Sequence, residues 1–286
     1  MGDVNLEIKL NNLDERVIKI EGSGGTSITV DSELSDTSTN PVQNKVITTK
    51  LSQIDNNSRR TRRNITSDLA NLPTAISEQN LEKYGYAIGD YFIGPSGYYY
   101  HLADMNTNYG GYGYNLQAVV NTNHCGIVVD TKSSCQWLSE GTVTNYSSST
   151  LHSFLTNTAL PNIKSDIATL FGDWENHLLK RTEIDNAIGS WGTTWEGLKD
   201  CLICAMTEVQ MYGSRIFGAD GNQTGTGVKS LELFRKYRFN EIYGSTFIWL
   251  KSLASTSRAC AAGAHGYATL DAFSETRLVS GLILFH

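Results

Sequence analysis

The stretch Arg277-Leu278-Val279-Ser280-Gly281-Leu282-Ile283-Leu284-Phe285 is apolar at most of its positions and lies at the end of the 286-residue sequence. A short run of this kind, rich in branched side chains, is typical of a buried strand. Two earlier segments, Leu202–Glu208 and Phe247–Ser252, have a similar pattern. We therefore predict that the last third of the sequence contributes short core strands, separated by long loops.

Upstream of these strands, the segment from Tyr84 to Met105 is rich in aromatic residues. Gly94-Pro95-Ser96-Gly97 lies in its middle and is a strong turn signal, so the segment predicts a β-hairpin. A further strand is expected at residues 123–130. Helical patterns are expected at residues 148–155, 159–171, 181–187 and 231–239. The segment from residue 84 to residue 286 is therefore predicted to be a globular head of the α+β class.

The order of the last blocks resembles that of a known family. Met206-Thr207-Glu208, Trp249-Leu250-Lys251-Ser252 and the strand from Arg277 to Leu284 follow one another as in C-type-lectin-like domains of the formylglycine-generating-enzyme type. Lys251 replaces the more common Arg of that family, and the final strand lacks its usual Pro. The resemblance implies a C-type-lectin-like head, a fold that is also used by the variable ligand-binding proteins that phage retroelements diversify.

The first eighty residues differ in kind, because they contain no Trp, Tyr, Phe or Cys. Such a segment cannot build a globular core of its own, so it is either disordered or buried between identical copies. Apolar residues at alternating spacings of four and three favour a coiled coil of identical chains. The predicted trimerisation positions are Leu6, Leu10, Leu13, Val17 and Ile20 in a first seam, and Ile47, Leu51, Ile54, Ile65 and Leu72 in a second.

The second seam also contains the polar residues Ser58, Thr61 and Asp68, which reduce stability but help to fix register. Pro73 is expected to end this helix. The alternative is an ordinary amphipathic helix that packs on the head.

Between the two seams lies Ser38-Thr39-Asn40-Pro41-Val42-Gln43-Asn44-Lys45-Val46. This stretch closely resembles a short module of fibre and tail proteins from phages and prophages of gut bacteria, where it precedes a coiled coil. The resemblance covers roughly residues 28 to 55. It implies a virion structural protein that forms a homotrimer. We expect residues 1–27 to be a coiled-coil segment that anchors the chain to the virion, and residues 28–80 to be the trimerisation module and coiled coil.

Composition excludes several partners. Charged residues make up only 18% of the sequence and the net charge is −6, with no basic block beyond Arg59, Arg60, Arg62 and Arg63. Nucleic-acid binding needs a concentrated basic surface, so no nucleic-acid partner is expected. No apolar run is long enough to cross a bilayer, and the N-terminus lacks the pattern of a secretion signal, so no membrane partner is expected either.

The residues that carry chemistry in other proteins give no enzymatic signature here. Cys201 and Cys204 form a CxxC pair, but the surrounding run is apolar and predicts a core strand rather than a metal or redox site. Cys260 has His265 five residues away, yet its neighbours are small packing residues. The five cysteines are expected to be reduced and mostly buried. We predict no enzyme activity, no cofactor and no metal site, and residues 220–224 offer only a weak match to a Ca²⁺ loop.

Two groups of residues are candidates for ligand binding. Tyr109, Tyr112 and Tyr114 lie in a loop of Asn and Gly, a composition typical of binding surfaces but also of trimer interfaces. The second group follows from the likeness to the variable lectins, which present ligand contacts in the corresponding region; the alternative is a surface loop over the tryptophan. Its members are Trp249, Arg258, His265 and Tyr267.

Together these features predict a homotrimeric phage fibre protein that is assembled in the bacterial host cytoplasm and becomes part of the virion. The N-terminus would bind other virion proteins, and the head would bind a host-surface receptor, either a glycan or a protein. The alternative is a capsid head-fibre or decoration protein with a mainly structural role. A depolymerase would need an acidic cleft, for which the sequence gives no signature.

Overall fold

The computed structural model describes residues 61–105, 123–139, 145–183, 185, 198–214, 216–217 and 230–286. The chain divides into two units, Met1–Arg60 and Thr61–His286, and all of these residues belong to the second. The first seam, the module at residues 38–46, and Ile47, Leu51 and Ile54 lie outside the described residues. Their predicted roles therefore stay predictions.

The sheet of the head is organised around β10, the strand at the end of the chain. β10 pairs with β3 on one side in antiparallel register, from Thr276↔Gln136 to Phe285↔Cys125. On its other side it pairs with β7 in parallel at Leu278↔Ile248, and with β6 at Leu282↔Cys204. The eight strands of this mixed sheet follow the order β1-β2-β3-β10-β7-β8-β9, with β6 beside β10.

The bounds of its strands are β1 Tyr91–Ile93, β2 Tyr99–Met105, β3 Cys125–Gln136, β6 Cys204–Ala205, β7 Ile248–Leu253, β8 Arg258–Ala262, β9 Ala268–Ala272 and β10 Thr276–Phe285. A separate pair consists of β4 Arg181–Glu183 and β5 Leu198–Cys201.

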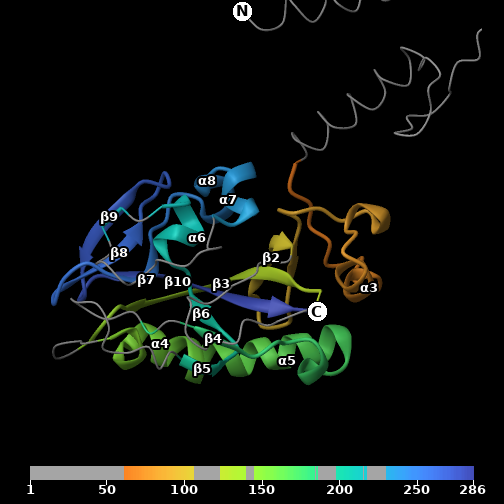
Figure 1. Ribbon diagram of the computed structural model, residues 1–286, viewed down its shortest axis with the longest axis horizontal. Helices are drawn as coiled ribbons and strands as arrows, with labels where there is room; N and C mark the ends of the chain where they lie inside the picture. The colour runs from red at the N-terminus through yellow and green to blue at the C-terminus, as the bar shows by residue number, and fades with distance from the viewer. Residues whose placement is uncertain are drawn as a thin grey trace, which may run out of the picture. The chain divides into compact units, whose positions relative to one another are not determined.

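Helices lie on both sides of the large sheet (Figure 1). On one side, α4 Thr150–Phe154, the π-helical η3 Leu155–Ala159 and α5 Leu160–Phe171 follow one another without a break. On the other side lie α6 Glu208–Tyr212, α7 Glu232–Lys236 and α8 Phe239–Tyr243. The remaining helices are α3 Leu72–Ser77 and the 3₁₀ turns η1 Glu82–Tyr84, η2 Tyr146–Ser148 and η4 Trp174–Asn176. None of the helices in the described part of the chain has the length and hydrophobicity that a bilayer span needs.

A buried carboxylate fastens α5 to the hairpin β1–β2. Asp166 of α5 accepts hydrogen bonds from the Ser96 backbone N–H at 2.8 Å and from the Tyr100 hydroxyl at 2.7 Å. A side chain at Gly94 would collide with this carboxylate, since an added Cβ would lie 2.2 Å from Asp166 Oδ2. The Gly94-Pro95-Ser96-Gly97 turn thus reverses the chain and also contacts α5.

The structure corrects the predicted extent of the coiled coil. Ile65 and Leu72, assigned to the second seam, are buried in the core of the head. Residues 61–65 are not helical; the Ile65 N–H donates to Tyr91 O at 2.8 Å, so this segment runs along the edge of β1. Pro73 lies in the first turn of α3, a position that Pro favours, and so begins a helix rather than ending one. The head therefore begins by residue 61 and not at residue 84.

Most of the elements expected for the head are present. The α+β class, the aromatic hairpin, the strand after residue 123 and the strand at the end of the chain are confirmed. The predicted helix at residues 181–187 is wrong at its start, because Arg181–Glu183 is strand β4. Its alternation places Arg181 and Glu183 on the same face, where both side chains are buried.

Candidate functional site

The predicted ligand-binding residues lie in different environments. Tyr109, Tyr112 and Tyr114 lie outside the described residues. Trp249 is wholly buried in β7, and its indole N–H donates to Cys135 O at 2.9 Å. Its assignment as a ligand contact is wrong: an apolar side chain in the middle of a buried strand packs in the core, and no part of it reaches solvent.

Arg258, His265 and Tyr267 are exposed on the hairpin β8–β9, but they do not form one cluster. Arg258 begins β8, whereas His265 and Tyr267 lie in the turn after its other end. Four residues of strand separate the two ends, which corresponds to about 13 Å. The turn end carries the exposed aromatic side chain, whereas Arg258 pairs with Ala272 at the other end.

An exposed aromatic side chain marks that end of the hairpin. Tyr267 keeps 51% of its surface exposed and meets the Phe247 ring edge-on, with 6.0 Å between ring centroids. The guanidinium of Arg277 lies over the other aromatic ring, 4.8 Å from the Phe247 centroid. These contacts hold the Tyr267 ring beside the sheet while leaving much of it open to a partner.

Polar groups complete this surface. Tyr267, Thr269 and Asp271 alternate along the edge strand and so share one of its faces. Asp271 accepts a hydrogen bond from Arg277 Nε at 2.7 Å, which fixes both charged groups beside the aromatic pair. We call Phe247, Tyr267, Thr269, Asp271 and Arg277 the C-terminal platform.

The platform combines an exposed aromatic ring with a fixed carboxylate–guanidinium pair. An aromatic ring offers a large and rigid contact area, and charged groups make strong hydrogen bonds to hydroxyls. This arrangement suits a glycan or a polar protein loop. The sequence predicted Tyr267 but not Phe247, Thr269, Asp271 or Arg277. The alternation of Tyr267, Thr269 and Asp271 was an available signal for Thr269 and Asp271.

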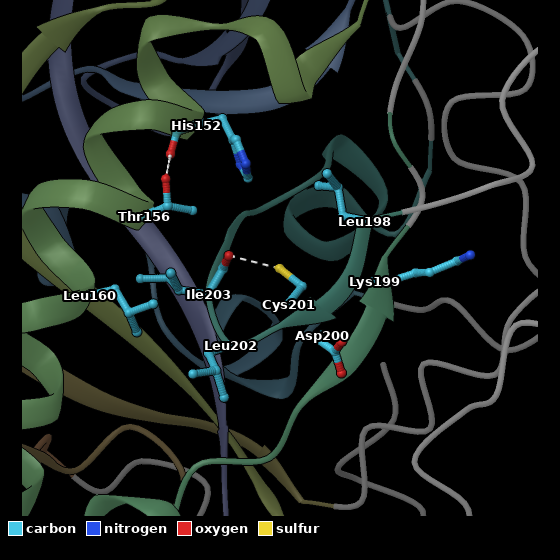
Figure 2. Close-up of a pocket in the computed structure, with 9 residues that line it drawn as sticks. All are labelled: His152, Thr156, Leu160, Leu198, Lys199, Asp200, Cys201, Leu202 and Ile203. Carbon is cyan, nitrogen blue, oxygen red and sulfur yellow. Dashed lines mark hydrogen bonds between the residues drawn. The ribbon is translucent and has the colours of Figure 1, made fainter.

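A second feature is a pocket of about 380 Å³ between the α4–α5 helix and β5 (Figure 2). His152 from α4 and Cys201 at the end of β5 point into it. Its lining residues are His152, Thr156, Leu160, Leu198, Lys199, Asp200, Cys201, Leu202 and Ile203. Burial lowers the pKa of His152, and its Nδ1 has no hydrogen-bond partner in the described part of the chain. The imidazole therefore offers a neutral polar group to the pocket.

Three buried charges connect β4 with β7. Glu183 accepts from Arg181 Nε at 2.6 Å and from Lys251 Nζ at 3.1 Å. Burial by itself would raise the pKa of Glu183, but the two cations lower it to about 2. The carboxylate is thus ionised, and it is the bridge between β4 and β7. We call Arg181, Glu183 and Lys251 the buried triad.

The cysteines are free thiols, as expected. Cys125, Cys201, Cys204 and Cys260 are buried, and Cys135 is half-buried. Burial raises the pKa of Cys260, whose neighbour is Glu208 rather than the exposed His265. Within the described ranges no three His, Cys, Asp or Glu side chains are grouped to hold a metal ion, and the loop at residues 220–224 lies outside those ranges.

Comparison of the chain with protein-family models, with curated proteins and with solved structures finds no match in any of the three.

Proposed function

We propose that the chain is a homotrimeric fibre protein of a phage virion, and that its C-type-lectin-like head binds a receptor on the host surface without catalysis. The observation that carries the proposal is the C-terminal platform. There, Tyr267 is held 51% exposed against Phe247, and the guanidinium over the Phe247 ring is that of Arg277, which pairs with Asp271.

The stalk half of the proposal is supported by the sequence. Residues 38–46 resemble a module of phage fibre and tail proteins, and Ile47, Leu51 and Ile54 continue into a coiled-coil seam. Residues 1–27 would then attach the fibre to other virion proteins. Three copies of the head would present three platforms to one surface, which raises the apparent affinity of a weak site.

A glycan receptor fits the platform best. An aromatic ring with polar neighbours binds the apolar face of a sugar ring, while Asp271 and Arg277 offer an acceptor and a donor to adjacent hydroxyls. The half-exposed Tyr267 ring offers a contact surface to such a ligand.

The test is binding of the fluorescently labelled full chain to an array of bacterial surface polysaccharides and oligosaccharides. We expect selective binding that Tyr267→Ala weakens by at least about tenfold, the loss typical of an aromatic anchor. Arg258→Ala is the matched control, because Arg258 is exposed on the same hairpin but pairs with Ala272, and so lies on the opposite face from Asp271. We expect this variant to bind like the wild type.

Other outcomes overturn parts of the proposal. Binding to no glycan and to no host-cell surface protein would favour the capsid decoration protein instead. Release of sugar fragments from a bound polysaccharide would show a depolymerase. An equal loss in both variants would show that the hairpin as a whole, and not the platform, supports binding.

A further inference from the structure

The pocket beside β5 contains a pair of thiols whose surroundings differ. Cys201 is the last residue of β5 and lines the pocket, where its thiol donates a hydrogen bond to Ile203 O at 2.9 Å (Figure 2). Cys204 begins β6, where it pairs with Leu282 of the central strand and is 1% exposed. One thiol of the CxxC pair therefore borders a space for a small molecule, and the other lies behind it in the core.

The groups around the two sulfurs favour thiolate at the outer position. Cys201 lies opposite Arg181 in the β4–β5 pair. The positive charge of Lys251, a member of the buried triad, acts to lower the pKa of both cysteines. A hydrogen bond with Cys204 lowers the pKa of Cys201, whereas burial raises the pKa of Cys204. Cations next to a thiol stabilise the thiolate, which is the reactive form.

We propose that Cys201 and Cys204 form a thiol–disulfide exchange site, with the pocket taking a small-molecule disulfide. The Cys201 thiolate attacks one sulfur of the disulfide; a bond forms between that sulfur and Cys201 Sγ, and the first half of the small molecule leaves as a thiolate. Cys204 then attacks Cys201 Sγ, which closes the Cys201–Cys204 disulfide and releases the second half.

The reaction balances between the two partners. The protein loses two hydrogens and is oxidised by two electrons, and the small disulfide is reduced to two thiols that take up the two protons. Cys204 needs no access to solvent, because its target is the neighbouring Cys201 sulfur. The product bond would join the end of β5 to the start of β6 and so tie the β4–β5 pair to the central sheet.

The experiment treats the full chain with 5,5′-dithiobis(2-nitrobenzoate), a small aromatic disulfide, and follows release of the coloured thiolate. Cys135 is half-buried and burial raises its pKa to about 12, so Cys135→Ser serves as the background for all samples. We expect thiolate release to show a fast phase whose rate is at least about tenfold higher than that of Cys135 in the wild type. That phase should release two equivalents and leave no adduct on the protein.

Single variants separate the two roles. Cys204→Ser should release one equivalent and keep the aromatic adduct on Cys201, and Cys201→Ser should lose the fast phase. Peptide mapping of the Cys135→Ser protein, in which Cys201 and Cys204 are unchanged, should show the Cys201–Cys204 cross-link. The test therefore does not depend on variants that fail to fold. A fast phase that survives in Cys201→Ser, or an adduct retained without a cross-link when both cysteines are present, would overturn the proposal.

Discussion

Lys251 Nζ lies 3.1 Å from Glu183 Oε2, although both side chains are buried in the interior of the head. Lys251 lies in the middle of β7, next to the wholly buried Trp249 and Leu250. A Lys in such a strand is stable only with a partner, because an isolated buried charge has a large desolvation penalty. The partner comes from β4, so this ion pair connects the small strand pair to the large sheet.

The first prediction concerns the lysine. Lys251→Met removes the cation and leaves Glu183 buried with Arg181 alone. We expect the free energy of unfolding to fall by about 3 kcal/mol, measured by urea denaturation of the full chain. Lys236→Met is the matched control, since the Lys236–Glu232 ion pair is partly exposed and is expected to contribute less than about 1 kcal/mol. Equal stability of Lys251→Met and wild type would show that the triad does not hold β4 in place.

The second prediction is the pH dependence that follows from Glu183. Burial opposes ionisation, but Lys251 and Arg181 lower the pKa of this carboxyl from 4.5 to about 2. Between these values the unfolded chain binds more protons than the folded chain. The stabilisation is therefore present above about pH 4.5 and is lost as pH falls through about 2.

Glu183→Gln should remove this dependence. As the pH falls from 5 to 2, we expect the wild type to lose on the order of 3 kcal/mol more of its unfolding free energy than Glu183→Gln does. Glu175→Gln is the control, because Glu175 is exposed in η4, and it should lose as much as the wild type. Wild-type acid sensitivity in Glu183→Gln would contradict the ionised state of the triad.

The third prediction concerns the glycine beneath the platform. A Cβ added at Gly263 would lie 2.4 Å from Tyr267 Cζ, so Gly263→Ala should displace the exposed ring. Because the ring is at the surface and can move, we expect the unfolding free energy to change by less than about 1 kcal/mol. Binding to the array glycans should fall as far as it does in Tyr267→Ala. In the Tyr267→Ala background, Gly263→Ala should have no further effect on binding, and an additive loss would show that the glycine acts elsewhere.

The fourth prediction concerns association. Sedimentation equilibrium of the full chain should give three times the 31.5 kDa mass of one chain. Ile54→Asp should lower the mass toward that of the monomer, because a charge in an apolar seam position opposes helix association. Asn57→Asp, which introduces the same charge outside the seam, is the control and should remain trimeric. A monomeric wild type would contradict the stalk.

The contrast between prediction and structure has physical causes. The central strand and the aromatic hairpin were predictable, because burial on both faces and a Gly-Pro-Ser-Gly turn are local signals. The start of the head at residue 61 was not, because Ile65 and Leu72 keep the spacing of a helical seam but are core residues of the head. A periodic pattern does not show whether its apolar face meets another copy or the rest of the same chain.

The candidate sites depended even more on tertiary contacts. Exposure of Tyr267 and burial of Trp249 follow from the edge and central positions of their strands, which the sequence does not state. The pocket at Cys201 forms between β5 and the α4–α5 helix, and the triad forms where β4 and β7 meet. Residues 181–187 were predicted to be helical. Arg181–Glu183 is a strand instead, and its alternation places the side chains of Arg181 and Glu183 on the same face.

The most direct test of receptor binding through the platform is a titration of the full chain against the glycan that it binds best on the array, by surface plasmon resonance. The account predicts measurable binding whose Kd rises at least about tenfold in Tyr267→Ala and is unchanged in Arg258→Ala. A Kd that is the same in Tyr267→Ala as in the wild type would contradict it.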